Sequence, residues 1–227
     1  MIINHSFRFI FIHTPKAAGT SVTSKLSEFT RYCDQEIGNR NPAMMRYFAN
    51  RFGLRKHSTA AHVRPIVGED VWREYFTFAF VRDPYARLVS AYTFLCKWEN
   101  CPEAARKELD KLDTAQKFLD SEYWSASPGP DNIFVPQTHW VCENSKSRTP
   151  LVDFVGRTER LDQDMTRILQ RIEGKDSGTD AAVPALNVST RARPDVDWTP
   201  ELVARVQRVY APDFEAFYPE AVPPAPE

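Results

Sequence analysis

The chain has 227 residues, 42% of them hydrophobic and 26% charged, which suits one globular domain with a buried core and is too short for two large ones. Its 29 Lys and Arg residues nearly balance its 30 Asp and Glu residues. This balance argues against non-specific nucleic-acid binding, which normally shows a basic excess, so any anion site needs a few well-placed cations and backbone amides.

The chain opens with a predicted strand, a tight loop and a helix. Residues 7–13 (FRFIFIH) are rich in aromatic and β-branched side chains, which favour a strand. Residues 14–19 form a turn, and apolar residues at helical spacing follow over 20–29. This order aims backbone N–H groups and a helix N-terminus at an anion.

A second helix is predicted over residues 40–52, followed by a short helix capped by Ser58 or Thr59. We expect the large apolar side chains of residues 40–52 to pack in the core: Met44, Met45, Tyr47, Phe48 and Phe52.

Residues 75–81 (YFTFAFV) are apolar on both faces, which is typical of a central parallel strand covered by helices. Asp83 can cap the next helix and Pro84 can occupy its first position. That helix is predicted to extend to about residue 98.

The rest of the chain continues the alternation, with a strand over 151–155 and helices over 103–120, 161–172 and from Thr199 onward. Strands alternating with helices predict an α/β fold with a mainly parallel central sheet flanked by helices. Ligands bind such sheets at the carboxyl ends of the strands. We expect a single domain over residues 1–218 and a Pro-rich C-terminal tail over 219–227.

The first segment that carries chemistry is HTPKAAGTS, residues 13–21. Small residues let the backbone approach a ligand, and Lys16 adds a full charge at the loop. Thr20 and Ser21 can donate hydroxyl protons. A Walker A loop has its lysine after the second glycine, whereas Lys16 precedes Gly19 by three residues. An ordinary strand–helix turn with a surface lysine is the structural alternative.

The second segment is FVRDPYARLVSAY, residues 80–92. Arg82 follows a strand and therefore points toward the ligand crevice. Arg87 and Ser90 are three residues apart, so they share a helix face. A guanidinium and a hydroxyl beside a helix start can form a second phosphate site. Alternatively, Arg82 pairs with a carboxylate, Arg87 is solvated and Ser90 serves packing.

These segments resemble motifs of the sulfotransferases that use 3′-phosphoadenosine 5′-phosphosulfate (PAPS). TPKAAGTS is similar to their 5′-phosphosulfate loop, and VRDPYARLVSAY to their 3′-phosphate motif. The likeness is closest to the carbohydrate, 2-O-sulfotransferase-like branch, and it continues through residues 154–164 and 208–217. It implies a P-loop-like sulfotransferase fold.

The resemblance also implies roles for individual residues. Lys16 would stabilise charge on the leaving phosphate oxygen. The 5′-phosphosulfate would be held by the loop amides and hydroxyls of Ala17, Ala18, Gly19, Thr20 and Ser21. The 3′-phosphate and the nearby nucleotide would contact Arg82, Ser90, Arg87 and Arg157. A loop closing over cofactor or acceptor would fall within residues 187–193, at Asn187, Ser189 and Arg191.

Sulfuryl transfer is an in-line displacement in which an acceptor hydroxyl attacks sulfur and adenosine 3′,5′-bisphosphate (PAP) leaves. A base must take the hydroxyl proton, and histidine suits that task near neutral pH. His57 is the preferred base and His62 the alternative. Some members of the resembled family use a carboxylate instead.

The implied acceptor is a hydroxyl on a glycan or glycoside, with no nucleic-acid partner. Four aromatic residues either form a sugar-stacking surface or belong to the core: Trp98, Tyr123, Trp124 and Trp140. No metal is expected, because no His, Cys and carboxylate cluster is visible. The alternatives are a P-loop-like kinase and a nucleotide-binding protein without catalysis.

The four cysteines show neither a CxxC pair nor metal-ligand spacing, so reduced structural thiols are expected. The sequence shows no signal-peptide pattern and no run of about 20 apolar residues. We therefore predict a cytoplasmic protein without a transmembrane segment.

Overall fold

The structure is a computed structural model, and it describes residues 1–38, 41–99, 101–144, 146–174, 182–183 and 194–224. The strands are β1 (Ile2–Asn4), β2 (Phe9–Ile12), β3 (Gln35–Glu36), β4 (Phe76–Val81) and β5 (Phe154–Arg157). The helices are α1 (Gly19–Leu26), α2 (Pro42–Phe52), α3 (Ala60–Val67), α4 (Glu69–Glu74), α5 (Pro84–Cys96), α6 (Glu103–Lys111), α7 (Ala115–Asp120), α8 (Tyr123–Ala126), α9 (Thr138–Val141), α10 (Leu161–Glu173), α11 (Pro200–Val209) and α12 (Ala211–Phe217). Short 3₁₀ turns are η1 (Ser27–Phe29), η2 (Pro130–Asn132) and η3 (Thr158–Arg160).

The strands form one sheet in the order β3-β1-β2-β4-β5. β2 pairs parallel with β4, and β4 pairs parallel with β5, so that Phe78 lies between Phe11 and Phe154. β1 is antiparallel to both β2 and β3. The predicted α/β fold with a mainly parallel central sheet is confirmed, and the antiparallel edge is an addition to it.

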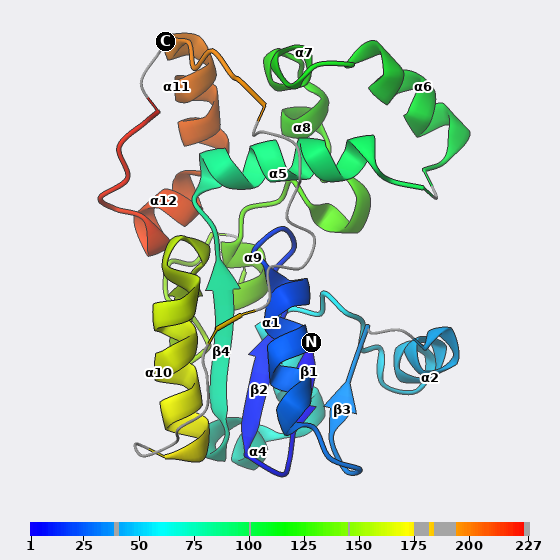
Figure 1. Cartoon of the computed structure of the whole chain (residues 1–227), viewed down its shortest axis with the longest axis vertical. Coiled ribbons are helices and arrows are strands. Elements are labelled where there is room, and N and C mark those ends of the chain that lie inside the picture. The colour runs from blue at the N-terminus through cyan, green and yellow to red at the C-terminus, as the bar shows by residue number, and fades with distance from the viewer. Residues whose placement is uncertain (39–40, 100, 145, 175–181, 184–193, 225–227) are drawn as a thin grey trace.

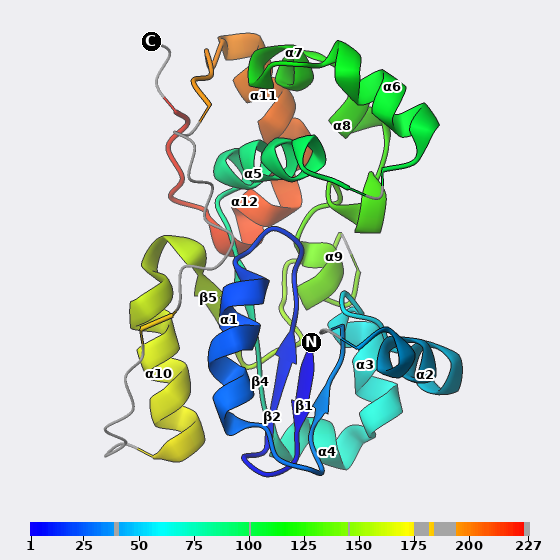
Figure 2. The ribbon, with the colours of Figure 1, turned by 45° about the vertical axis from the view of Figure 1, so that its right-hand side comes forward.

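Alternating side chains of the strands enter separate cores on the two faces of the sheet, as the pleat of a strand requires. Phe9 and Phe11 pack with α1 and α10 on one face. Ile10 and Ile12 pack on the other face with residues of α3, α4 and α9. In Figures 1 and 2, α1 and α10 lie side by side on their face of the sheet.

A third core lies within the helices drawn above the sheet in Figure 1. It joins α5, α7, α8, α11 and the start of α12 through buried residues such as Leu88, Phe118, Trp124 and Tyr210. The arrowhead of β4 points at this helical layer. The carboxyl end of the central strand therefore faces the layer, which is where the functional site forms.

Helix α2 confirms the helix predicted near residues 40–52 but not the burial predicted for its side chains. Phe48 is buried at 7% exposure. The exposed fractions of the others are 46% for Met44, 42% for Met45, 53% for Tyr47 and 41% for Phe52. The core prediction for these four was wrong because α2 lies beyond the edge strand β3, where the sheet no longer covers it (Figure 1).

Two other boundaries differ from the sequence prediction. The helix predicted over 103–120 is divided into α6 and α7, because Thr114 caps a new helix by accepting a hydrogen bond from the Lys117 N–H. The strand predicted over 151–155 begins at Phe154 and ends at Arg157. All four cysteines are free thiols. Within the described part of the chain, every helix is too short or too polar to cross a bilayer.

Candidate active site

The loop between β2 and α1 has an unusual backbone. Lys16 and Ala18 have φ angles of 64° and 55° although neither is glycine. Left-handed backbone at such residues is costly and gathers at functional sites, where alternating conformations turn successive N–H groups toward an anion. Gly19 then begins α1, and a Cβ at that position would lie 1.9 Å from Nε2 of His13. The histidine ring thus requires glycine at the start of the helix.

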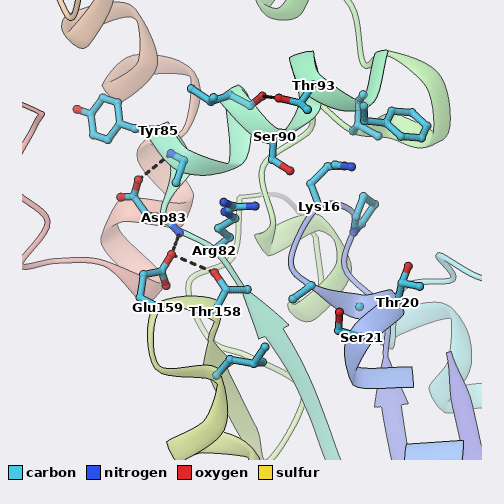
Figure 3. A pocket seen from close by; sticks show the side chains of 18 of the residues that line it. Lys16, Thr20, Ser21, Arg82, Asp83, Tyr85, Ser90, Thr93, Thr158 and Glu159 are labelled. Carbon is cyan, nitrogen blue, oxygen red and sulfur yellow. Dashed lines mark hydrogen bonds between the residues drawn. The ribbon is translucent and has the colours of Figure 1, made fainter. Parts of the chain in front are cut away.

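Arg82 follows directly after β4, and its backbone is held on both sides by one buried side chain. The Arg82 N–H donates to Oε1 of Gln137 at 2.8 Å, and Nε2 of Gln137 donates to the Arg82 carbonyl at 2.8 Å. Asp83 then caps α5 by accepting from the Ala86 N–H at 2.9 Å. Figure 3 shows Asp83 also joined to Glu159 through its backbone N–H.

Both loops line a single cleft with a volume of about 1730 Å³. Lys16, Arg82 and Ser90 come from the first loop, the end of β4 and α5, and Figure 3 shows their side chains around the same space. The cleft is also lined by Ala18, Gly19, Thr20, Ser21, Lys56, His57 and Lys97. Ala17 is different, since its methyl group is buried in the core beneath α1. The predicted loop residues and Arg82 therefore lie together.

The cleft holds several positive charges close together. Burial first, and then the charges of Arg82 and Lys56, lower the pKa of Lys16 from 10.5 to about 8. The Lys16 ammonium also lies 4.5 Å from the centre of the Phe94 ring. Burial lowers the pKa of Lys56 as well, while Asp131 opposes that shift. A bound anion would relieve this mutual repulsion.

The donor groups that line the cleft fit a ligand with phosphate and sulfate oxygens. Lys16, Arg82, Ser90 and Thr20 supply an ammonium, a guanidinium and two hydroxyls, all of which can donate to anionic oxygen. Thr14, at the start of the first loop, has a buried hydroxyl without a hydrogen-bond partner among the described residues. Among the described residues, no cluster of three His, Cys, Asp or Glu side chains is placed to hold a metal.

The two histidines considered as bases lie in different places. Nδ1 of His57 is 2.8 Å from the carbonyl oxygen of His13. Because a carbonyl only accepts, Nδ1 carries the proton and Nε2 keeps its lone pair. Burial is the main cause that lowers the pKa of His57 to about 4, although its hydrogen bond to His13 opposes this. His62 is exposed and outside the cleft lining, with its ring near Gly53.

The sequence predicted that Arg87 points into the cleft with Ser90, but its side chain points into the protein instead. Its guanidinium is 1% exposed and donates to the carbonyls of Pro15 at 3.2 Å and Ile133 at 2.9 Å. The rings of Trp140 and Tyr210 flank it. Arg87 is therefore placed to support the first loop from behind through its bond to Pro15.

Arg157 also lies away from the cleft. Its guanidinium pairs with Glu220 and donates to the carbonyl of Phe217, and it lies 4.7 Å from the centre of the Tyr218 ring. The next residues turn back to the site: Glu159 accepts from the Asp83 N–H and from the Tyr218 hydroxyl at 3.0 Å. Arg157 thus ties the C-terminal region to the end of β5.

The sequence analysis missed the buried polar residues behind Arg82. Asp213, from α12, accepts from Nε2 of Gln137 at 3.2 Å and from the Thr138 N–H at 3.0 Å. Asp213 and Gln137 are fully buried, and burial raises the pKa of Asp213 while Arg87 opposes the shift. The sequence offered little signal, since residues 208–217 contain both Asp213 and Glu215 and nothing in the pattern shows which carboxylate is buried.

The aromatic residues considered for sugar stacking belong to the cores instead. Trp124 and Trp140 are each 1% exposed, and Trp98 and Tyr123 pack against the helical core. The tryptophan that lines the cleft is Trp198, whose ring meets Tyr85 edge-on at 5.1 Å. Asn187, Ser189 and Arg191, predicted in a closing loop, lie outside the described residues.

Comparison with known proteins gives one family. A sequence profile described as "Sulfotransferase family" matches residues 1–219, which is nearly the whole chain and includes both loops of the cleft. No curated protein and no solved structure matches the chain significantly.

Proposed function

The chain belongs to the sulfotransferase family, and from this premise we propose that it transfers a sulfuryl group from PAPS to a hydroxyl of a carbohydrate or glycoconjugate. The observation that carries the proposal is the pair of cationic loops after neighbouring parallel strands β2 and β4. Two anion sites facing one cleft suit a donor with separated 5′ and 3′ anionic groups.

The side chains divide between the two ends of such a donor. PAPS, when bound, supplies an activated sulfuryl group. Lys16 and the amides at the start of α1 would hold the 5′-phosphosulfate and stabilise charge on the leaving oxygen. Arg82 and Ser90 would hold the 3′-phosphate. Charge stabilisation and positioning supply most of the catalysis in transfers of this type.

His57 would accept the proton of the acceptor hydroxyl through Nε2. Its pKa of about 4 makes it neutral at pH 7, which leaves the lone pair available, but also makes it a weak base. A bound anion would raise that pKa, because it offsets the charges of Lys56 and its neighbours. Donor binding would thus prepare the base for the transfer step.

The cleft leaves room for an acceptor beside the donor. Its volume of about 1730 Å³ exceeds the roughly 300–1,000 Å³ of an ordinary small-molecule pocket. Trp198 lines the cleft, and an aromatic ring at such a place suits contact with the apolar face of a sugar. We also propose that residues 1–218 form a single cytoplasmic domain and that transfer needs no metal.

Calorimetric titration with PAP tests the proposal, with ATP plus Mg²⁺, 5′-AMP and NAD as comparators. We expect PAP to be preferred, and Arg82→Ala to weaken it at least tenfold, since a charged hydrogen bond contributes about 1.5–3 kcal/mol. Arg73→Ala, at an exposed ion pair on α4, is the matched control and should bind PAP normally. A preference for ATP would support a kinase, and PAP binding without transfer to any acceptor would support a non-catalytic nucleotide-binding protein.

A further inference from the structure

Helix α2 presents an exposed apolar surface that the proposed reaction does not use. The α2 patch consists of Met44, Met45, Tyr47 and Phe52, each between 41% and 53% exposed. Only Phe48 attaches the helix to the core as a buried side chain. Helices of soluble proteins normally turn such residues inward, and a clustered exposed patch marks a contact surface. Figures 1 and 2 show α2 at the margin of the molecule.

The aromatic rings of the patch pack against each other, and arginines lie on the same helix. Tyr47 lies 6.1 Å from Phe52 between ring centres, and both pack against Phe48. The Arg51 guanidinium lies 5.7 Å from the centre of the Phe52 ring. Arg46 is also exposed on this helix. Apolar rings and arginines thus occupy one short helix.

The charged side chains in the sequence around α2 are positive. Between Glu36 and Glu69 the chain has six Lys and Arg residues and no Asp or Glu, although the whole chain carries a formal charge of −1. Arg64 is the member of this group that pairs with Glu69 at 2.7 Å. The α2 region therefore fits a partner that is both apolar and negatively charged.

Two carboxylates lie beside one side of the helix and accept hydrogen bonds from neighbouring groups. Asp34 and Glu36 line a groove beside Met44 and Met45. Asp34 accepts from the backbone N–H groups of residues 5, 6 and 31, and Glu36 accepts from the Ser27 hydroxyl. They leave the side of α2 that carries Tyr47, Arg51 and Phe52 positive.

We propose that α2 docks the protein on an anionic lipid bilayer, with the patch entering the interface and the arginines contacting lipid phosphates. Aromatic and apolar residues beside Lys and Arg on one helix are the pattern of interfacial helices. A symmetric contact between two copies through this patch would gather Arg46 and Arg51 of both copies in one interface, which like-charge repulsion opposes.

The patch also has a position that matters for the cleft. Lys56 and His57, which line the cleft, follow α2 in the chain after a turn at Gly53. Docking through α2 would place this wall of the cleft near the bilayer surface. An acceptor carried by a lipid would then reach the site without leaving the membrane.

Vesicle sedimentation tests the docking surface separately from catalysis. The full chain is spun with vesicles of phosphatidylcholine alone or with about 30% phosphatidylserine, at low and high salt. We expect binding only to the anionic vesicles, weakened by salt. Arg46→Gln/Arg51→Gln should lower the partition coefficient about 25-fold, since each cation at an anionic surface contributes about fivefold. Tyr47→Ser/Phe52→Ser should also release the protein.

Lys107→Gln/Lys111→Gln on α6 is the matched control, because it removes the same charge from exposed positions elsewhere and should leave binding unchanged. Absence of vesicle binding, equal binding to neutral vesicles, or unchanged binding by the α2 variants would each overturn the proposal. A dimer that Tyr47→Ser/Phe52→Ser converts to a monomer would identify a second copy as the occupant. PAP titration on the same variants keeps the test of the reaction separate.

Discussion

Replacing Gln137 by methionine tests whether the buried polar residues behind Arg82 position it for anion binding. Methionine keeps the approximate volume of glutamine but cannot make its hydrogen bonds. The substitution removes both bonds to the Arg82 backbone and one bond to the Asp213 carboxylate. Arg82 itself stays in the chain, so an effect on binding must act through its position.

The expected magnitudes follow from those bonds. Two neutral bonds and one bond to a buried carboxylate are lost, and Asp213 keeps its bond to the Thr138 N–H. We expect the free energy of unfolding to fall by about 2–4 kcal/mol. A displaced guanidinium weakens a charged bond to the 3′-phosphate, so the affinity for PAP should fall about ten- to a hundredfold.

Thr77→Val provides the control at the opposite end of the same strand. Thr77 is 1% exposed and exchanges two hydrogen bonds with Asp153, each 2.9 Å long. Loss of the Thr77 hydroxyl and its hydrogen bonds should reduce the free energy of unfolding by about 1–3 kcal/mol and leave PAP affinity unchanged. Urea unfolding without ligand and calorimetric PAP titration measure the two effects separately.

Two results would refute the reasoning. If Gln137→Met folds and binds PAP as tightly as the wild type, the bonds from Gln137 do not position Arg82. If Thr77→Val weakens PAP binding as strongly, the loss reflects general destabilisation of the sheet instead of a local displacement.

Three further predictions concern the first loop and the histidines beside it. Burial is the main cause that lowers the pKa of Lys16 to about 8, so Lys16 loses its charge above that pH. The PAP affinity measured by calorimetry should therefore fall between about pH 8 and pH 10, and Lys16→Arg should remove this fall. A flat wild-type profile would contradict the role of Lys16 in binding the anion. His57, with a folded pKa of about 4 against 6.5 unfolded, binds fewer protons when folded, so stability should fall by about 2 kcal/mol from pH 7 to pH 5 through this group. His57→Gln should reduce that slope in urea unfolding and lower turnover without loss of PAP binding, whereas full activity would exclude it as the base. Gly19→Ala should lower Tm and PAP affinity, because the new methyl group would clash with the His13 ring. Adding His13→Ala should restore Tm. An unchanged Tm and PAP affinity in the single variant would show that the loop adapts to the methyl group.

The central elements of the fold could be predicted because their local patterns are long. β4 is a continuous apolar run, and α10 repeats apolar residues at helical spacing over 13 residues. β1 and β3 have three and two residues, which is too short for an alternating pattern, and they depend on pairing with β2 and with each other. The partner of β3 is β1, far earlier in the chain, and a local pattern cannot show such a pairing.

The site divides in the same way. Lys16 and Arg82 could be placed at the cleft because each follows a predicted parallel strand. Arg87 could not be placed, because its spacing only shows that it shares a helix face with Ser90. The sequence does not show that its guanidinium donates hydrogen bonds to the buried carbonyls of Pro15 and Ile133. Gln137 acts through the backbone of a residue 55 positions away, and no local pattern reports that contact.

The bond between Gln137 and Asp213 has a consequence for synthesis of the chain. Asp213 is translated 76 residues after Gln137, an interval on the order of 4 to 15 seconds at ordinary elongation rates. Until α12 has emerged from the ribosome and docked, Gln137 and Thr138 lack their buried carboxylate. β2 and β4 can pair much earlier, so the two loops can come together before Arg82 is fully supported. A nascent chain would therefore gain the proposed affinity for the donor only after α12 has docked.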